Sequence, residues 1–211
     1  MATPQIPRWD VPRRQPDHVW SSVAPLPPLE LADGSGTPEQ ATVVRLCWDD
    51  RALYVRFECE DRDSWATKTK RDDSLWEEEV VEVFLAAGRQ AAVRYVEFEV
   101  NPLGALFDAW IYNPSSNRAD RQVDMAWDCP GLRWEAGRGP ERQDWWAELS
   151  IPWEAVAGGP SPPRLWRANF YRAERPRDGS PELSSWSPIL SRPVDFHTPA
   201  RFGVLELSKS R

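Results

Sequence analysis

Cysteine and histidine are scarce in this chain of 211 residues, and this limits the chemistry available to it. There are three cysteines and two histidines, with no CxxC pair and no Cys/His cluster that could hold a metal ion. Cys47 and Cys59 fall inside strand-like patterns, so we predict buried free thiols for them and for Cys129 rather than disulfides. No serine lies in a nucleophile elbow with His18 or His197 as its base, which disfavours nucleophilic catalysis.

Long apolar runs and an excess of positive charge are also missing. The net charge of −7 disfavours a nucleic-acid partner, because binding to a phosphate backbone normally leaves a basic footprint. No apolar run reaches membrane length, and residues 1–16 lack the apolar core of a signal peptide. We therefore expect a cytoplasmic protein without a membrane partner, or a secreted one if a leader precedes this sequence. The oligomeric state stays open.

Tryptophan is the residue that the chain has in unusual number. Hydrophobic residues make up 41% and charged residues 28%, values typical of one folded domain of this length. Thirteen tryptophans stand out against this ordinary background. Some must lie in the core, but rings that are large, flat and amphipathic also suit stacking on a ligand.

Short strand-like runs follow one another from residue 42 onward. In residues 53–59 (LYVRFEC), apolar and polar positions alternate, which is typical of a strand with one buried face. The runs are 42–48, 53–59, 80–85, 93–100, 105–112, 132–136, 145–151, 165–172 and 202–207. The only convincing helix is short, at 152–156, between Pro152 and Gly158.

This succession predicts an all-β fold. We expect a two-sheet antiparallel β-sandwich, jelly-roll or immunoglobulin-like, with long loops and one short helix. The proline-rich residues 1–40 are expected to form an extended segment packed on a sandwich at 41–211.

A glutamate inside an apolar strand marks the first candidate site. Glu82 lies in the run VVEVFL, where a carboxylate needs a partner or a ligand. Arg94 and Arg172 are candidate ion-pair partners, and an ion pair is about as favoured as a ligand contact. The long segments 60–79, 113–130 and 176–199 all carry tryptophan, and such loops are common places for binding residues.

Other acidic residues allow two further interpretations. Strand glutamates could supply the two carboxylates of a glycoside hydrolase, although no signature selects a pair. Structural calcium is possible at Asp61 and Asp63, or at Asp120, Asp124 and Asp128, because calcium takes six to eight oxygen ligands.

Six segments in a fixed order resemble the family 9 carbohydrate-binding modules, a DOMON-like β-sandwich. They are residues 48–55 (WDDRALYV), 75–84 (LWEEEVVEVF), 97–104 (EFEVNPLG), 146–152 (WAELSIP), 168–172 (ANFYR) and 196–205 (FHTPARFGVL). Together they run across residues 40–207. The resemblance implies a non-catalytic protein that binds a mono- or oligosaccharide, often at chain ends.

The resemblance also implies site residues. In that family a sugar ring lies between two tryptophans and is hydrogen-bonded by charged and amide side chains. Trp76 matches the first tryptophan and Glu82 the acid in the following strand. Trp186 is the candidate for the second tryptophan, with Trp127 and Trp65 as competitors. Arg94 and Asn169 complete the set as further polar contacts. The alternative is a structural or interaction sandwich that has lost the ligand.

Overall fold

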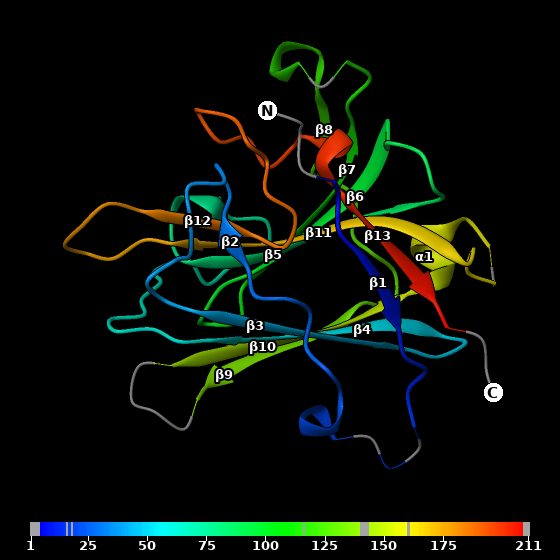
Figure 1. Cartoon of the computed structure of the whole chain (residues 1–211), viewed down its shortest axis with the longest axis horizontal. Helices are drawn as coiled ribbons and strands as arrows, with labels where there is room; N and C mark the ends of the chain where they lie inside the picture. Colours follow the sequence, from blue (N-terminus) through cyan, green and yellow to red (C-terminus); the bar gives the residue numbers. More distant parts are fainter. Residues whose placement is uncertain are drawn as a thin grey trace.

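Two β-sheets pack face to face in the computed structural model (Figure 1). The structure describes residues 5–15, 17, 19–115, 117–139, 144–159 and 161–208. The prediction that concerned His18 therefore lies outside the described residues. No helix among these residues is long and apolar enough to cross a membrane.

The large sheet has the order β1-β13-β11-β5-β6-β7-β8, with β12 and β2 added beside β11. Its strands are β1 (Arg8–Val11), β2 (Glu30–Leu31), β5 (Val80–Ala87), β6 (Arg94–Val100), β7 (Leu106–Tyr112), β8 (Gln122–Asp124), β11 (Leu165–Glu174), β12 (Glu182–Ser185) and β13 (Gly203–Leu207). All neighbours are antiparallel except β1, which runs parallel to β13. The segment before residue 40 thus adds an edge strand, β1, and the short β2 to the sandwich.

The small sheet has the order β3-β4-β10-β9. Its strands are β3 (Thr42–Trp48), β4 (Ala52–Cys59), β9 (Arg133–Arg138) and β10 (Trp145–Pro152). The helix α1 (Trp153–Ala157) begins directly after Pro152 and ends at Gly158, whose φ of 72° is a left-handed conformation that glycine adopts without a Cβ clash. Four short 3-10 helices lie in the loops: η1 (Trp20–Ser22), η2 (Leu75–Glu77), η3 (Arg118–Asp120) and η4 (Pro199–Arg201).

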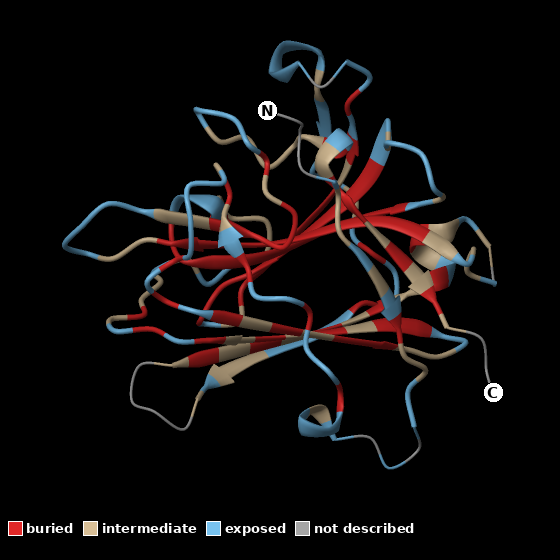
Figure 2. Ribbon diagram, viewed as in Figure 1, coloured by how far each residue is buried: buried red, intermediate tan, exposed pale blue. Residues whose placement is uncertain are grey.

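The main core fills the space between the two sheets. In β4, Leu53, Val55 and Phe57 point inward and are fully buried, as their alternation predicts. Buried ribbon runs through both layers, while exposed residues lie in the loops and in the edge strands β8 and β9 (Figure 2). Cys47, Cys59 and Cys129 are buried and none of the three forms a disulfide, which confirms the prediction of buried thiols.

The large sheet is also covered on its outer face, which is the feature that positions the candidate site. A second apolar cluster lies there, with Phe84, Tyr95, Phe107, Tyr171 and Phe202 as its large rings. Loop residues between β12 and β13 pack over it. Because both faces of β5 and β6 are buried, a charged residue on the outer face is enclosed as well.

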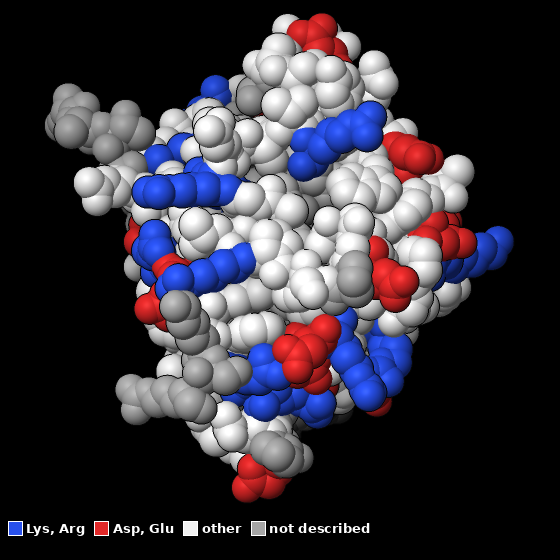
Figure 3. All heavy atoms as spheres, turned by 90° about the vertical axis from the view of Figure 1, so that its right-hand side faces the viewer, with Lys and Arg blue, Asp and Glu red and all other residues white. Residues whose placement is uncertain are grey.

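The outer surface carries charges of both signs. On the face shown in Figure 3, basic and acidic side chains are interspersed and separated by uncharged surface. The described residues on this face therefore form no extended basic patch of the kind that nucleic-acid binding uses.

Candidate functional site

A row of four side chains crosses the outer face of the large sheet. Tyr171 pairs with Glu82, Glu82 with Glu99, and Glu99 with Phe107, each directly opposite on the neighbouring strand. Directly opposite residues share one face of a sheet. Three inter-strand steps of about 4.8 Å place Tyr171 and Phe107 about 14 Å apart, with two carboxyl groups between them.

Two aromatic rings from loops stand over the ends of this row. Phe196 stacks on Tyr171, with ring centroids 4.1 Å apart and planes at 14°. Trp76 meets Phe107 edge to face at 5.3 Å, and its side chain is 39% exposed. The turn η2 holds Trp76 in place because its neighbour Leu75 is fully buried. The carboxyl groups thus lie between two partly exposed rings.

Glu97 joins Glu82 and Glu99 in one carboxylate cluster. It lies on the same face of β6 as Glu99, and one oxygen from each of the three lies within 4.8 Å of the others. All three side chains are buried. Burial and then the neighbouring Glu97 hold the pKa of Glu82 well above its usual range. Burial likewise raises the pKa of Glu97 to about 8, and burial with Glu82 and Glu97 raises that of Glu99.

Positive groups approach the cluster without pairing fully with it. Arg175 donates a hydrogen bond to the Trp76 carbonyl at 2.9 Å. The Nε2 of His197 lies 3.8 Å from Glu97, but burial lowers the His197 pKa to about 3, so this ring is neutral at pH 7. In the described part of the chain, no Lys or Arg forms an ion pair with Glu82 or Glu99.

Trp186 does not occupy the second stacking position that the sequence suggested. It is 4% exposed and lies in the core between the sheets, 5.8 Å from Phe170. The ring also presses on the backbone of β13, since a Cβ at Gly203 would be 2.3 Å from it. Its faces are therefore not open to a ligand. The aromatic residue over the row is Phe196, and its only sequence signal is the segment FHTP in the last long loop.

The competing tryptophans have structural roles in this structure. Trp127 packs on Phe98 and Trp110. Trp65 donates its Nε1–H to the Arg175 carbonyl at 2.6 Å.

Arg94 and Asn169 are not available to the row either. Arg94 is exposed at the start of β6, on the face opposite to Glu97, and stacks over Tyr112 at 5.5 Å. It lines a separate cavity of about 650 Å³. Asn169 is buried, and its amide donates to the Ser187 carbonyl at 2.8 Å and accepts from the Ser187 N–H at 2.9 Å. Of the predicted site residues, the structure brings together Trp76 and Glu82.

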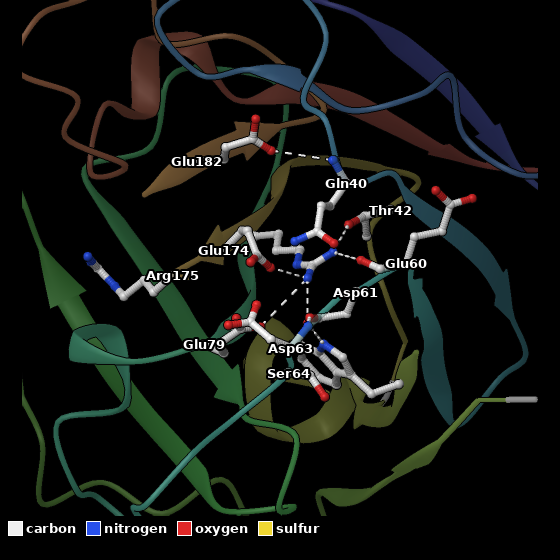
Figure 4. Close-up of polar contacts among 12 residues, drawn as sticks. Gln40, Thr42, Glu60, Asp61, Asp63, Ser64, Glu79, Glu174, Arg175 and Glu182 are labelled. Carbon is white, nitrogen blue, oxygen red and sulfur yellow. Dashed lines mark hydrogen bonds and ion pairs between the residues drawn. The ribbon is translucent and has the colours of Figure 1, made fainter. Parts of the chain in front are cut away.

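Glu82 forms an ion pair with neither of the two candidate partners, Arg94 and Arg172, because both arginines lie on the opposite face of the sheet. Arg172 lies on the inner face of β11 and binds Asp61 at 2.8 Å, together with Glu174, and lies 3.6 Å from Glu79. Figure 4 shows Asp61, Glu79 and Glu174 converging from different segments, with Arg175 pointing away from them. This network joins β11 to the loop after β4.

The acidic residues considered for calcium fall into two places. Asp61 and Asp63 lie near Glu174, where Arg172 supplies a positive charge. Asp128 lies near Asp72 and Asp108, where Arg71 pairs with Asp108 at 2.6 Å. Asp120 and Asp124 belong to neither group; Asp120 instead accepts from the Ser115 hydroxyl. Structural calcium stays a prediction.

Comparison with known proteins identifies the family and the fold. Residues 35–207 match the sequence model of carbohydrate-binding family 9, and the chain belongs to that family. The expected β-sandwich of this type is thereby confirmed, and carbohydrate binding is the function of its class.

Individual relatives are more distant. The chain is 28% identical over 159 residues to a protein of Arthroderma benhamiae named an extracellular protein, covering 71% of this chain and 72% of that protein. A putative carbohydrate-binding protein from Bacteroides uniformis superposes with a TM-score of 0.76 at 18% identity, covering 97% of this chain and all of the other. A family 9 module from Caldicellulosiruptor kristjanssonii superposes with TM-scores of 0.68 in complex with cellotriose and 0.67 in complex with glucose, at 16% and 18% identity. Each alignment covers 97% of this chain, with 95% and 97% of the module.

Proposed function

We propose that this chain binds a sugar ring between Trp76 and Phe196, over Glu82 and Glu99. The observation that carries the proposal is the cross-strand row with an aromatic ring above each end and carboxyl groups between. Sugar C–H faces are apolar and pack on aromatic rings, while hydroxyl groups donate to carboxylates.

Family membership and the site together support a ligand of the glucose type. The solved family 9 module was bound to cellotriose and to glucose, and its fold superposes on this chain. The site is mostly preformed by strands, which limits the entropy lost on binding.

The test is calorimetric titration of the chain with glucose and cello-oligosaccharides. Trp76→Ala is expected to weaken binding at least about tenfold, which is about 1.4 kcal/mol, because it removes one stacking face. Trp134→Ala is the matched control, since this ring is 37% exposed but lies on β9 of the small sheet. Equal loss in both variants, or no heat with any sugar, would contradict the proposal.

A hydrolase that uses the same carboxylates is the second candidate. Oxygens within 4.8 Å of one another resemble the close carboxyl pair of retaining glycosidases. Those enzymes hold one carboxyl protonated and the other ionised. Here burial raises the pKa of all three glutamates, and no Lys or Arg of the described residues pairs with Glu82 or Glu99. Binding without hydrolysis therefore fits better, and sugar release lost in Glu82→Gln would favour the enzyme.

The expected cytoplasmic location finds no support, and we propose an extracellular one instead. The proposal is supported by the matched Arthroderma benhamiae protein, whose name places it outside the cell. Immunoblotting of culture medium and cell extract tests it. Protein confined to the cell extract would contradict it.

A further inference from the structure

Raised pKa values, and not paired cations, keep the buried carboxyl cluster of Glu82, Glu97 and Glu99 from carrying full negative charge at pH 7. In the described part of the chain, none of the three pairs with Lys or Arg, in contrast to the Arg172 and Arg71 clusters. The Oε2 of Glu99 is buried, in a residue 1% exposed, and has no hydrogen-bond partner, while the carboxyl group as a whole meets the Trp76 N–H and the Glu97 carboxyl group. A buried, unpaired carboxylate oxygen costs free energy that a positively charged donor would recover.

The groups that face the cluster are few, and they come from every element packed on it. They are Tyr95 and Tyr171 from the sheet, Arg175 beside β11, Arg121 and Asp195 as an ion pair in the loops, and His197. Arg121 is occupied by Asp195 at 3.0 Å, and His197 is neutral at pH 7. Arg175 is directed to the Trp76 carbonyl. None of these groups places a positive charge at the unpaired Glu99 oxygen.

The geometry of the cluster fits an ammonium group. Three oxygens that lie within 4.8 Å of one another are at most about 2.8 Å from a common centre. That distance is the usual length of an N⁺–H···O⁻ hydrogen bond, about 2.7–2.9 Å. An ammonium group has three N–H donors and no acceptor, so one nitrogen at this centre satisfies one oxygen of each glutamate.

The aromatic rings above the cluster favour an organic cation over a metal ion. Trp76 and Phe196 present ring surface beside the carboxylates, and a ring face attracts an organic cation. A calcium ion takes six to eight oxygen ligands, and three carboxyl groups supply six only if each one binds through both of its oxygens.

We infer that the ligand of this site is an amine-bearing sugar, whose ring lies between Trp76 and Phe196 and whose ammonium group binds Glu82, Glu97 and Glu99. The inference rests on the proposed sugar site and names its ligand class. Because the glutamates hold protons before the ligand arrives, binding of the ammonium releases protons.

The experiment compares D-glucosamine, D-glucose and N-acetyl-D-glucosamine by calorimetry at pH 7, in two buffers of different ionisation enthalpy. Glucosamine is expected to bind at least about tenfold more tightly than either neutral sugar, with a heat that depends on the buffer. Glu99→Gln is expected to bring the three affinities within about twofold of one another. The wild-type comparison decides the inference even if this variant folds poorly.

The outcomes separate this inference from the proposed function. Equal binding of glucose and glucosamine, lost in Trp76→Ala, overturns the amine preference and leaves the sugar site intact. Glucose binding that requires calcium and disappears with a chelator overturns it in favour of a metal. Absence of binding by all three sugars overturns both proposals.

Discussion

At the scale of single residues, the site depends on where Glu82 points. Its neighbours across the strands are Tyr171 and Glu99, so the strand register places a second carboxyl group beside it instead of an arginine. Sequence analysis identified Glu82 as anomalous because a carboxylate in an apolar strand needs an explanation. Its neighbours could not be derived, because cross-strand partners depend on strand order and register, which a single sequence does not encode locally.

Proton binding by Glu97 gives a prediction at this scale. Burial raises its pKa from 4.5 to about 8, so the folded chain holds a proton that the unfolded chain has released in this range. The stability contributed by this group is therefore lost as the pH rises from about 4.5 to about 8. Glu97→Gln keeps the size of the side chain and does not titrate.

Thermal unfolding of wild type and Glu97→Gln across this pH range measures the effect. The melting temperature of the wild type is expected to fall relative to that of the variant as the pH rises. A difference between the two that stays constant with pH would contradict the assigned burial.

At the scale of elements, strands with strong alternation were well predicted and short edge strands were missed. β3 begins and ends at the predicted residues, and β5, β7 and β10 differ by two residues or fewer at each end. β1, β2, β8 and β12 contain two to four residues and lack a periodic pattern. Tertiary pairing, and not local preference, makes them strands.

Loop residues were the hardest to predict for the same reason. Trp186 and Phe196 lie in one long segment that has no hydrophobic periodicity, so the sequence does not show which ring faces the core. Trp186 follows β12 directly, and its N–H donates to the Phe170 carbonyl, which continues the pairing with β11 and turns the ring inward. Phe196 lies ten residues further along, after the chain has crossed to the outer face.

The contact between Trp186 and β13 yields a prediction at the scale of elements. Gly203→Ala places a methyl group 2.3 Å from the Trp186 ring, so we expect a loss of about 1–3 kcal/mol in the free energy of unfolding. Urea titration measures it. Gly159→Ala is the control, because nothing lies within 4 Å of a Cβ there. Similar small effects in both variants would argue against the buried position of Trp186.

At the scale of the whole molecule, the large sheet is enclosed between the small sheet and a layer of loops. The predicted β-sandwich is confirmed. A sandwich needs only one apolar face on each strand, the face that packs against the other sheet. The second apolar cluster on the outer face explains why β5 and β6 are buried throughout. Enclosure by loops also keeps Lys and Arg side chains of the described residues away from the carboxyl groups and places aromatic rings above them.

A crystal structure of the chain with a bound sugar tests the central claim most directly. The account predicts a sugar ring between Trp76 and Phe196, with a hydrogen bond from the ligand to Glu82. A ring bound elsewhere, such as in the cavity beside Arg94 and Tyr112, with no ligand between Trp76 and Phe196, would contradict it.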